Sequence, residues 1–251
     1  TTASGSDYIV ENNCIVFCEQ VYDTEGFNAN PTLATTQTPG EWYTDRFAPA
    51  GFVAESFDGD SRLKHSIDAS DCSSCRGGGL SGGFYDTQGR KYDISGATAM
   101  TIELYVPNDW ATTGRRMAGF WGTSVDAGDN ITGFPIIEFT STDGNPRFRG
   151  WNNGVWVDLG LPTGFTYDSW YTLEIALLPS DEFMYSVGDI SVAVPGLGSS
   201  DIDNVILQGH NTDTPGVTYD IYWDNFNTFC APVANNAPTV GISVTAAAGS
   251  E

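Results

Sequence analysis

Two arginines and a tryptophan alternate along one predicted strand, at Arg147, Arg149 and Trp151. Side chains two residues apart on a strand point to the same face of a sheet, so these three should form one stripe. Guanidinium groups bind planar polar groups through paired hydrogen bonds, and aromatic rings offer flat apolar faces. The stripe is therefore a candidate ligand surface. The alternative is that the arginines pair with nearby carboxylates and that the tryptophan packs in the core.

Further polar and aromatic side chains lie on neighbouring predicted strands or beside them. Aromatic faces can stack on the C–H surfaces of sugars while fixed polar groups bind the hydroxyls, so this composition favours a carbohydrate ligand. The remaining candidates for that ligand site are Trp110, Arg115, Arg116, Trp121, Glu138, Trp156, Gln208 and His210.

Motifs of nucleophilic, metalloprotease, P-loop or dinucleotide chemistry are absent from the sequence. Gln208 and His210 are two residues apart on a predicted strand end, which is a weak signal by itself. A lone histidine is more often structural, and we expect His65 on the surface of a strand. The sequence therefore assigns no catalytic residue.

The charge balance excludes several classes of partner. The 251 residues hold 32 acidic and only 10 basic side chains, for a formal net charge of -22. Such a surface repels phosphate backbones and anionic membranes, so we expect no nucleic-acid partner. Runs of 18 or more apolar residues are also absent, so no membrane span is expected. The excess acidity is explained either by solubility in a salty medium or by carboxylates that hold Ca²⁺.

The five cysteines suggest an oxidising compartment. Cys14 and Cys18 are about 13 Å apart if they share a strand, too far for a mutual disulfide. We expect Cys18–Cys230, with Cys14–Cys230 as the alternative. Cys72 and Cys75 are expected to form a small loop disulfide, because no helix follows them for a redox site and too few zinc ligands lie nearby. One thiol is then left over or pairs between chains.

Alternation with a period of two residues predicts an all-β chain. Met100–Val106, 171–177 and 219–226 alternate most clearly, and Met100, Leu104, Leu173 and Ile175 are expected in the core. Many short strands separated by turns indicate an antiparallel two-sheet β-sandwich. The other predicted strands are 8–10, 14–22, 51–57, 62–68, 117–122, 134–140, 145–151, 154–159, 182–187, 189–194 and 203–209.

Three segments follow from this pattern. Residues 1–13 form an N-terminal segment, 14–230 the sandwich domain, and 231–251 a linker or the start of a following Ig-like repeat. The last segment is interrupted by proline and has no aromatic residue.

The order of these features resembles the concanavalin A-like lectin/glucanase superfamily, whose members include laminin-G-like and carbohydrate-binding modules. The resemblance rests on the strand Ala99–Val106, on Trp170-Tyr-Thr-Leu-Glu-Ile and on the closing Ile221-Tyr-Trp-Asp-Asn-Phe. It covers roughly residues 14–229 and implies a concanavalin A-like jelly roll.

The resemblance also implies a structural Ca²⁺ where the last strand meets an early loop. Its ligands would be Asp58, Asp60, Asp224 and Glu19. The alternative is an exposed turn at Asp58–Asp60, with Asp224 accepting hydrogen bonds from the backbone.

Catalytic motifs of enzymes with this fold are missing. Retaining glycosidases carry E-x-D-x-x-E, and the nearest string, Glu138-Phe-Thr-Ser-Thr-Asp143, does not match it. Lyases of this kind use Q-x-H, which Gln208-Gly-His210 matches, but their other strings are absent.

The sequence therefore favours a secreted or cell-surface module that binds a polysaccharide without cleaving it. One alternative is a self-assembling extracellular subunit that polymerises through its tail. Another is an enzyme that cleaves glycans, most simply a lyase. Composition alone does not separate the three.

Overall fold

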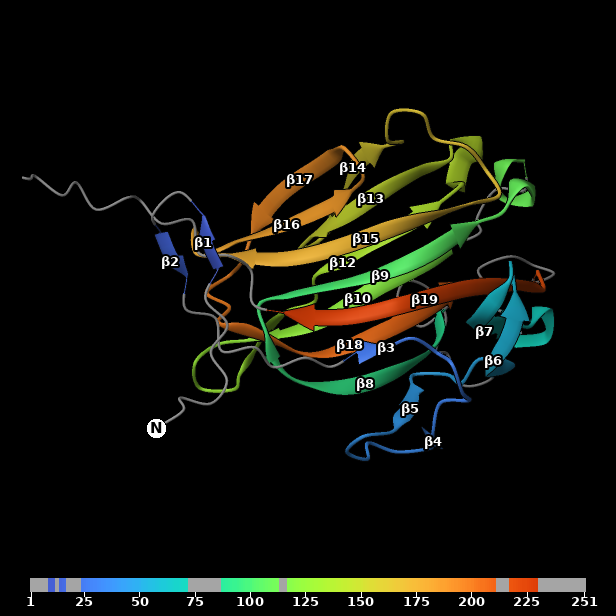
Figure 1. Cartoon of the computed structure of the whole chain (residues 1–251), viewed down its shortest axis with the longest axis horizontal. Coiled ribbons are helices and arrows are strands. Elements are labelled where there is room, and N and C mark those ends of the chain that lie inside the picture. The colour runs from blue at the N-terminus through green and yellow to red at the C-terminus, as the bar shows by residue number, and fades with distance from the viewer. Residues whose placement is uncertain are drawn as a thin grey trace, which may run out of the picture.

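The computed structural model describes residues 9–11, 14–16, 24–71, 87–112, 117–210 and 217–229. Within these ranges two large sheets, which we call sheet I and sheet II, pack face to face (Figure 1). Sheet II lies nearer the viewer in that figure, with sheet I behind it. A separate hairpin joins β1 (Ile9–Glu11) to β2 (Cys14–Val16).

Sheet I follows the order β14-β13-β12-β10-β18-β8-β5-β4, with β11 paired to β10. Its pairs are antiparallel except for β4 with β5. Its strands are β4 (Leu33–Ala34), β5 (Trp42–Asp45), β8 (Thr87–Ala97), β10 (Met117–Val125), β11 (Ile131–Gly133), β12 (Ile136–Thr140), β13 (Arg147–Asn152), β14 (Val155–Gly160) and β18 (Asp201–His210).

Sheet II follows the order β17-β16-β15-β9-β19-β7-β6, with β3 paired to β19, and is antiparallel. Its strands are β3 (Thr24–Glu25), β6 (Gly51–Phe57), β7 (Asp60–Ile67), β9 (Ala99–Val106), β15 (Ser169–Leu178), β16 (Glu182–Val187), β17 (Ile190–Pro195) and β19 (Tyr219–Phe229). In the described ranges the only helical turns are short 3₁₀ segments: η1 (Ala69–Asp71), η4 (Asn108–Ala111) and η5 (Thr142–Gly144).

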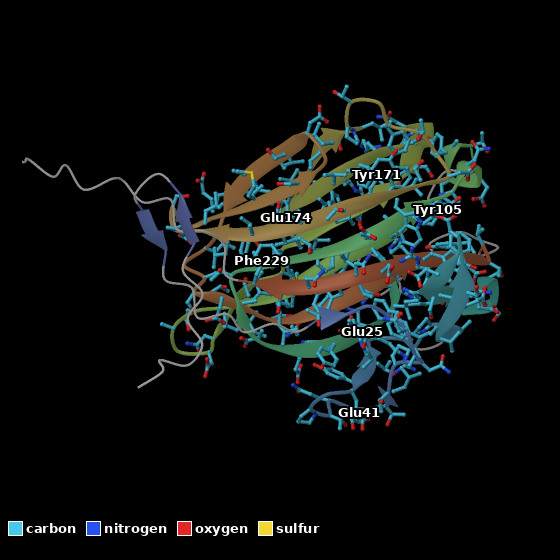
Figure 2. All side chains as sticks on the ribbon, viewed as in Figure 1. Glu25, Glu41, Tyr105, Tyr171, Glu174 and Phe229 are labelled. Carbon is cyan, nitrogen blue, oxygen red and sulfur yellow. The ribbon has the colours of Figure 1, made fainter. Side chains whose placement is uncertain are left out.

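The core lies between the two sheets, as the alternation predicts. Met100, Leu104, Leu173 and Ile175 are all fully buried in one apolar cluster, so the two-layer prediction is confirmed. Residues of opposite parity, such as Glu174, project from the outer face of sheet II (Figure 2). The chain is thus a two-sheet β-sandwich of the jelly-roll class, as the sequence predicts.

Strand β8 escaped the sequence analysis although it is among the longest. Its sequence, Thr87-Gln-Gly-Arg-Lys-Tyr-Asp-Ile, contains a glycine and several polar residues, which are depleted in strands. Gly89 is required by packing, because a Cβ there would collide with the Leu207 carbonyl and the Gln208 side chain. Its tertiary neighbours, and not its own propensity, place this segment in the sheet.

Several expectations fall on residues outside the described ranges. Cys18, Cys72, Cys75 and Cys230 are among them, as are most residues of the two predicted terminal segments, so the disulfides and domain boundaries stay predictions. In the part of the chain that the structure describes, no helix is long and apolar enough to cross a membrane.

The surface position expected for His65 is wrong. Its ring is fully buried on the inner face of β7, where Nε2 lies 3.0 Å from the Gln88 carbonyl and must donate to it. Burial, assisted by the nearby Arg90 cation, lowers the pKa of His65 to about 4. The histidine is therefore neutral in the folded protein at pH 7.

We expect His65 to make folding sensitive to acid. The folded state binds fewer protons than the unfolded state between pH 6.5 and 4, so stability present above pH 6.5 is lost as the pH falls toward 4. The loss attributable to this group is about 3 kcal/mol. Urea unfolding at pH 7 and pH 4 should show a smaller pH-dependent loss in His65→Gln than in the wild type. Equal losses in the two proteins would refute this role.

Candidate functional site

A row of aligned residues crosses the outer face of sheet I. Strand pairing places Glu138 opposite Gly119 on one side and opposite Arg149 on the other. The same register continues from Arg149 to Asp158 and from Gly119 to Gln208, Gly89 and Asp45. Seven strands thus contribute one residue each to a single line, which we call the polar row. Because cross-strand partners project to the same face, their side chains can act together.

An apolar row runs beside the polar row, two residues further along each strand. Trp121 is paired with Ile136 and with Ile206, and Trp151 is paired with Trp156. Together with Met117 these residues form an apolar cluster outside the main core. The face therefore offers carboxylates and cations along one line and aromatic surface along the next, which is the composition of a glycan site.

Glu138 is the most unusual group on this face. It is wholly buried in the middle of β12, and its Oε1 accepts a 2.5 Å hydrogen bond from Nε of Arg149. Among the described residues its Oε2 has no hydrogen-bond partner. Burial raises the pKa of Glu138 to about 7, although the charges of Arg149 and Arg147 act in the opposite direction. This carboxyl group is therefore close to half protonated at neutral pH.

The two arginines of the stripe each bind a carboxylate. Arg149 spans Glu138 and the aromatic row, because its guanidinium also lies 4.1 Å from the ring centroid of Trp156. Arg147 donates from Nε to Asp158 at 2.7 Å and from Nη1 to the Asn145 carbonyl at 2.7 Å. Both arginines are thus held by other groups at one end of the polar row.

The opposite end of the polar row is built around Asp45. Gln208 donates from Nε2 to Asp45 at 2.5 Å, and Arg46 forms an ion pair with the same carboxylate. The buried Oε1 of Gln208 has no hydrogen-bond partner within the described ranges. Between the two ends, the ring of Trp121 packs across Gly119, where a Cβ would collide with it. The polar row therefore has one polar cluster around Glu138 and another around Asp45, and the indole of Trp121 lies between them.

The candidates named from the sequence fall into four sets. Arg147, Arg149, Trp151, Trp156 and Glu138 come together on three adjacent strands. Gln208 and His210 lie on β18, two strands away from Glu138 in the sheet order. Trp121 is buried, and Trp110 belongs to the main core, where it stacks on Phe139 at 5.7 Å. Arg115 and Arg116 lie outside the described ranges.

Sequence reasoning missed Asp158, Asp45 and the two glycines of the polar row. Asp158 follows Trp156 with the right parity, and that alternation could have indicated it. Asp45 and Gly89 had no local signal, because only the pairing of β5 with β8 and of β8 with β18 brings them into line.

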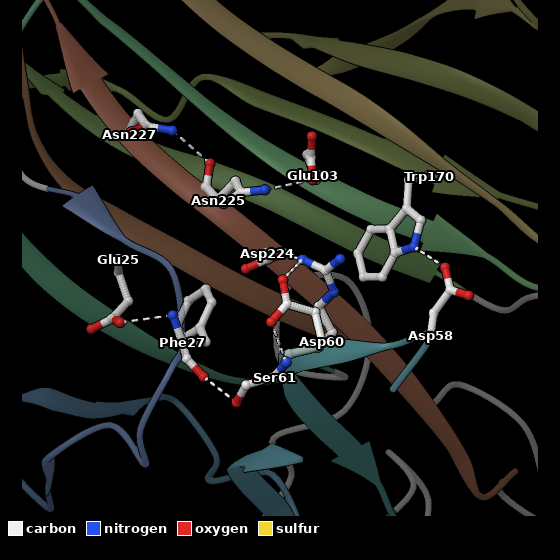
Figure 3. Close-up of polar contacts among 11 residues, drawn as sticks. Glu25, Phe27, Asp58, Asp60, Ser61, Glu103, Trp170, Asp224, Asn225 and Asn227 are labelled. Atoms are coloured by element: carbon white, nitrogen blue, oxygen red, sulfur yellow. Dashed lines mark hydrogen bonds and ion pairs between the residues drawn. The ribbon is translucent and has the colours of Figure 1, made fainter. Parts of the chain in front are cut away.

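The carboxylates expected to hold Ca²⁺ have a different cation among them. The buried carboxylate of Asp224 forms an ion pair with Arg62, whose Nη1 also lies 3.7 Å from Asp60. Asp58 instead accepts a 2.9 Å hydrogen bond from the indole of Trp170, as Figure 3 shows. Within the described ranges no three acidic, histidine or cysteine side chains gather as a metal site requires, and Glu19 lies outside them. Calcium binding stays a prediction.

We expect Arg62→Met to destabilise the protein by about 3–5 kcal/mol, because it leaves the Asp224 carboxylate buried without a partner. Arg62→Met combined with Asp224→Asn should recover part of that loss. Chemical denaturation measures the free energy of unfolding of these variants and so tests the ion pair. The same measurement on the wild type with and without CaCl₂ tests the predicted calcium binding. A fully stable single variant would show that Arg62 does not compensate Asp224.

Comparisons with known proteins support the fold. No family model matches the chain, and no curated protein matches it. Among solved structures, the GH16 protein of the Bacteroides ovatus mixed linkage glucan PUL, in complex with a G4G4G3G product, is 9% identical with a TM-score of 0.54. That match covers 82% of this chain and 99% of the other.

Two further solved structures match the chain. A GlcNAcα1-4Gal-releasing endo-β-galactosidase from Clostridium perfringens is 11% identical with a TM-score of 0.54, over 84% of this chain and 62% of that enzyme. A Bacillus licheniformis β-glucanase is 14% identical with a TM-score of 0.48, over 84% of this chain and 98% of the other. At identities this low, structural similarity shows the fold alone. The sequence resemblance described above had predicted the same fold.

These matches contradict the non-catalytic binding or adhesive module expected from the sequence. Of the two matches with a TM-score of 0.54, one is named as an endo-β-galactosidase and the other as a GH16 protein with a product bound, so the findings favour the alternative of an enzyme that cleaves glycans. The sequence analysis went wrong because it sought a complete catalytic string, whereas the titratable group of this face depends on burial and on strand pairing.

Proposed function

We propose that the chain hydrolyses glycosidic bonds on the outer face of sheet I, with Glu138 as the general acid. The observation that carries the proposal is the state of that carboxyl group: it is buried, one oxygen is held by Arg149, and the other has no hydrogen-bond partner in the part of the chain that the structure describes. A general acid must hold a proton near the working pH, and a pKa of about 7 meets that requirement.

A second carboxylate in the same row could serve as the general base. Asp158 lies two strands from Glu138, so their Cα atoms are about 10 Å apart. The side chain of Asp158 is 56% exposed and can contact water. Carboxyl groups about 6.5–9.5 Å apart leave room for a water molecule and lead to inversion, whereas about 5–5.5 Å is needed for a covalent intermediate. A Cα separation of about 10 Å is far longer than the carboxyl spacing of a covalent intermediate, so the reaction proposed for this pair is the inverting one.

Access to Glu138 requires a movement of Arg149. The guanidinium covers the carboxyl group and rests on Trp156, so a sugar that stacks on the aromatic row would displace it. Losing that cation would raise the pKa of Glu138 further, because Arg149 is one of the groups that lower it. Substrate binding and protonation of the acid are thus coupled.

The lyase alternative fits the contacts of this face less well. A lyase of uronate-containing glycans must neutralise the substrate carboxylate, yet the amide nitrogen of Gln208 already donates to Asp45. An acidic side chain at that position would repel an acidic sugar. A neutral polysaccharide is therefore the proposed substrate, and a secreted or cell-surface location would give the enzyme access to it.

We expect Glu138→Gln to lower kcat by about 10²–10⁴-fold, since it removes the transferable proton. Asp158→Asn should have an effect of similar size. Release of reducing ends from a panel of β-glucans and β-galactans measures both. A wild-type protein that cleaves no member of the panel, or an active Glu138→Gln, would contradict the proposal.

Asp143→Asn is the matched control for these variants. Asp143 stands five residues after Glu138, as the last carboxylate of E-x-D-x-x-E stands after the first, but it lies in η5 with a φ of 63° and not on the strand. We expect this variant to keep its activity. Loss of activity in Asp143→Asn alone would make Asp143, and not Asp158, the second carboxylate.

The pH dependence of hydrolysis offers an independent measurement. The general acid is protonated below a pKa of about 7, so kcat/KM should fall as the pH rises through about 7. Arg149→Met should move this alkaline limb to higher pH, because the variant loses a cation that favours the ionised carboxylate. An alkaline limb that does not move in this variant would argue against Glu138 as the acid.

A further inference from the structure

A cleft of about 270 Å³ opens beside the apolar row, where the edges of the two sheets meet. Its walls come from β11, β13, β16, β17 and their adjoining loops. Trp151, which belongs to the apolar row, is one of its lining residues. The lining residues all lie in the described ranges, and none of them carries a charge.

The rim of this cleft is unusually apolar for a surface. Ile131, Phe134 and Leu197 line it and are 63%, 40% and 42% exposed. Seven large apolar side chains are exposed in the described ranges, so nearly half of them gather around one opening. Single exposed apolar residues are ordinary, but a contiguous apolar patch usually marks a binding surface.

The wall beneath the rim is held in place by hydrogen bonds. Tyr185 is buried, and its hydroxyl donates to the Trp151 carbonyl at 2.9 Å. The same oxygen accepts from the backbone nitrogen of Ile136 at 3.3 Å. The cleft is therefore fixed to β12 and β13, the two strands that carry Glu138 and Arg149.

Leu197 is presented to the cleft by a strained turn. Its φ of 60° lies in the left-handed region, which bulky side chains rarely adopt. Asp181 holds the turn, since its carboxylate accepts from the nitrogen of Gly198 at 2.9 Å and its carbonyl accepts from Gly196 at 2.8 Å. A strained residue that keeps an apolar side chain at an opening is a candidate for function.

The cleft lies within reach of the proposed acid. Pro135 lines it and precedes Glu138 by three residues, which corresponds to about 10 Å along an extended chain. A glycan lying across Glu138 and Trp151 would therefore bring a neighbouring sugar to the mouth of the cleft.

We infer that this cleft binds an apolar substituent on a sugar ring, such as an O-methyl or O-acetyl group. Sugar hydroxyls would lose water there and find few partners, because the hydroxyl of Tyr185 is already hydrogen-bonded and most of the other lining side chains are apolar. The methyl group of such a substituent gains by the same transfer. The substrate class is then a neutral polysaccharide with such substituents. This identification of the substrate rests on the proposed function, but the cleft's preference can be measured without cleavage.

The test is calorimetric titration of the Glu138→Gln protein with matched glycans. One pair is glucomannan before and after alkaline removal of its acetyl groups, and the other is β-galactan oligosaccharides with and without O-methyl groups. We expect the substituted member of at least one pair to bind about fivefold to tenfold more tightly. The pair that shows the difference identifies the substituent.

Leu197→Asn is the test variant, because asparagine tolerates a positive φ and removes the apolar rim without adding strain. It should reduce the preference to about twofold or less. Leu161→Ser is the matched control, since Leu161 is an exposed leucine outside the cleft and its loss should leave the preference unchanged.

Equal affinities within both pairs, or no binding of any glycan, would overturn the inference, as would a preference that survives in Leu197→Asn. These results differ from a failure of the proposed function. A preference that depends on Leu197 in a protein without hydrolytic activity would support the cleft and refute the enzyme. Hydrolysis by a protein that binds substituted and unsubstituted glycans equally well would support the enzyme and refute the cleft.

Discussion

The antiparallel register of sheet I is the constraint on which the rest of the site depends. Seven strands from β14 to β5 align one residue each, and a shift of any strand by one position would turn its residue to the opposite face. The main core fixes that register, because Phe120, Phe139 and Phe148 must face inward for Glu138 and Arg149 to face outward. The chemistry of the outer face is thus secured by packing on the inner face.

Burial of Glu138 with Arg149 carries a desolvation cost that lowers the stability of the folded protein. Taking two charges out of water is expensive, and apolar replacements of a buried ion pair are often neutral or stabilising. A pair of this kind is therefore weak evidence for a structural role and better evidence for a functional one. The raised pKa of Glu138 shows that burial acts more strongly on this carboxyl group than the two nearby guanidinium groups do.

Several cations in the described part of this acidic chain pair with carboxylates. Arg62 pairs with Asp224 on the outer face of sheet II, while Arg147 and Arg149 pair with Asp158 and Glu138 on sheet I. The sequence left two readings of the arginines open, as ligand-binding groups or as partners of carboxylates. On sheet I the two readings are compatible, because the carboxylates that hold the arginines are the groups proposed to react.

Local sequence was sufficient for the layers and for most strands. The alternation of Met100 to Val106 and of Tyr171 to Leu177 encodes which side of each strand is apolar, and a two-sheet sandwich follows from burying those sides. The stripe of Arg147, Arg149 and Trp151 was predictable for the same reason. Composition also indicated a glycan-facing role through its aromatic residues, but it did not indicate catalysis.

Only the tertiary structure decided what Glu138 does. Its neighbours Gly119 and Arg149 are distant in the sequence or on other strands, and its partner in the proposed reaction, Asp158, lies two strands away. Strand β8 and Asp45 entered the site only through long-range pairing. Which side of a strand a residue faces follows from the residues next to it in the sequence. Strand order, strand register and the burial that shifts the pKa of Glu138 instead depend on contacts between segments far apart in the chain.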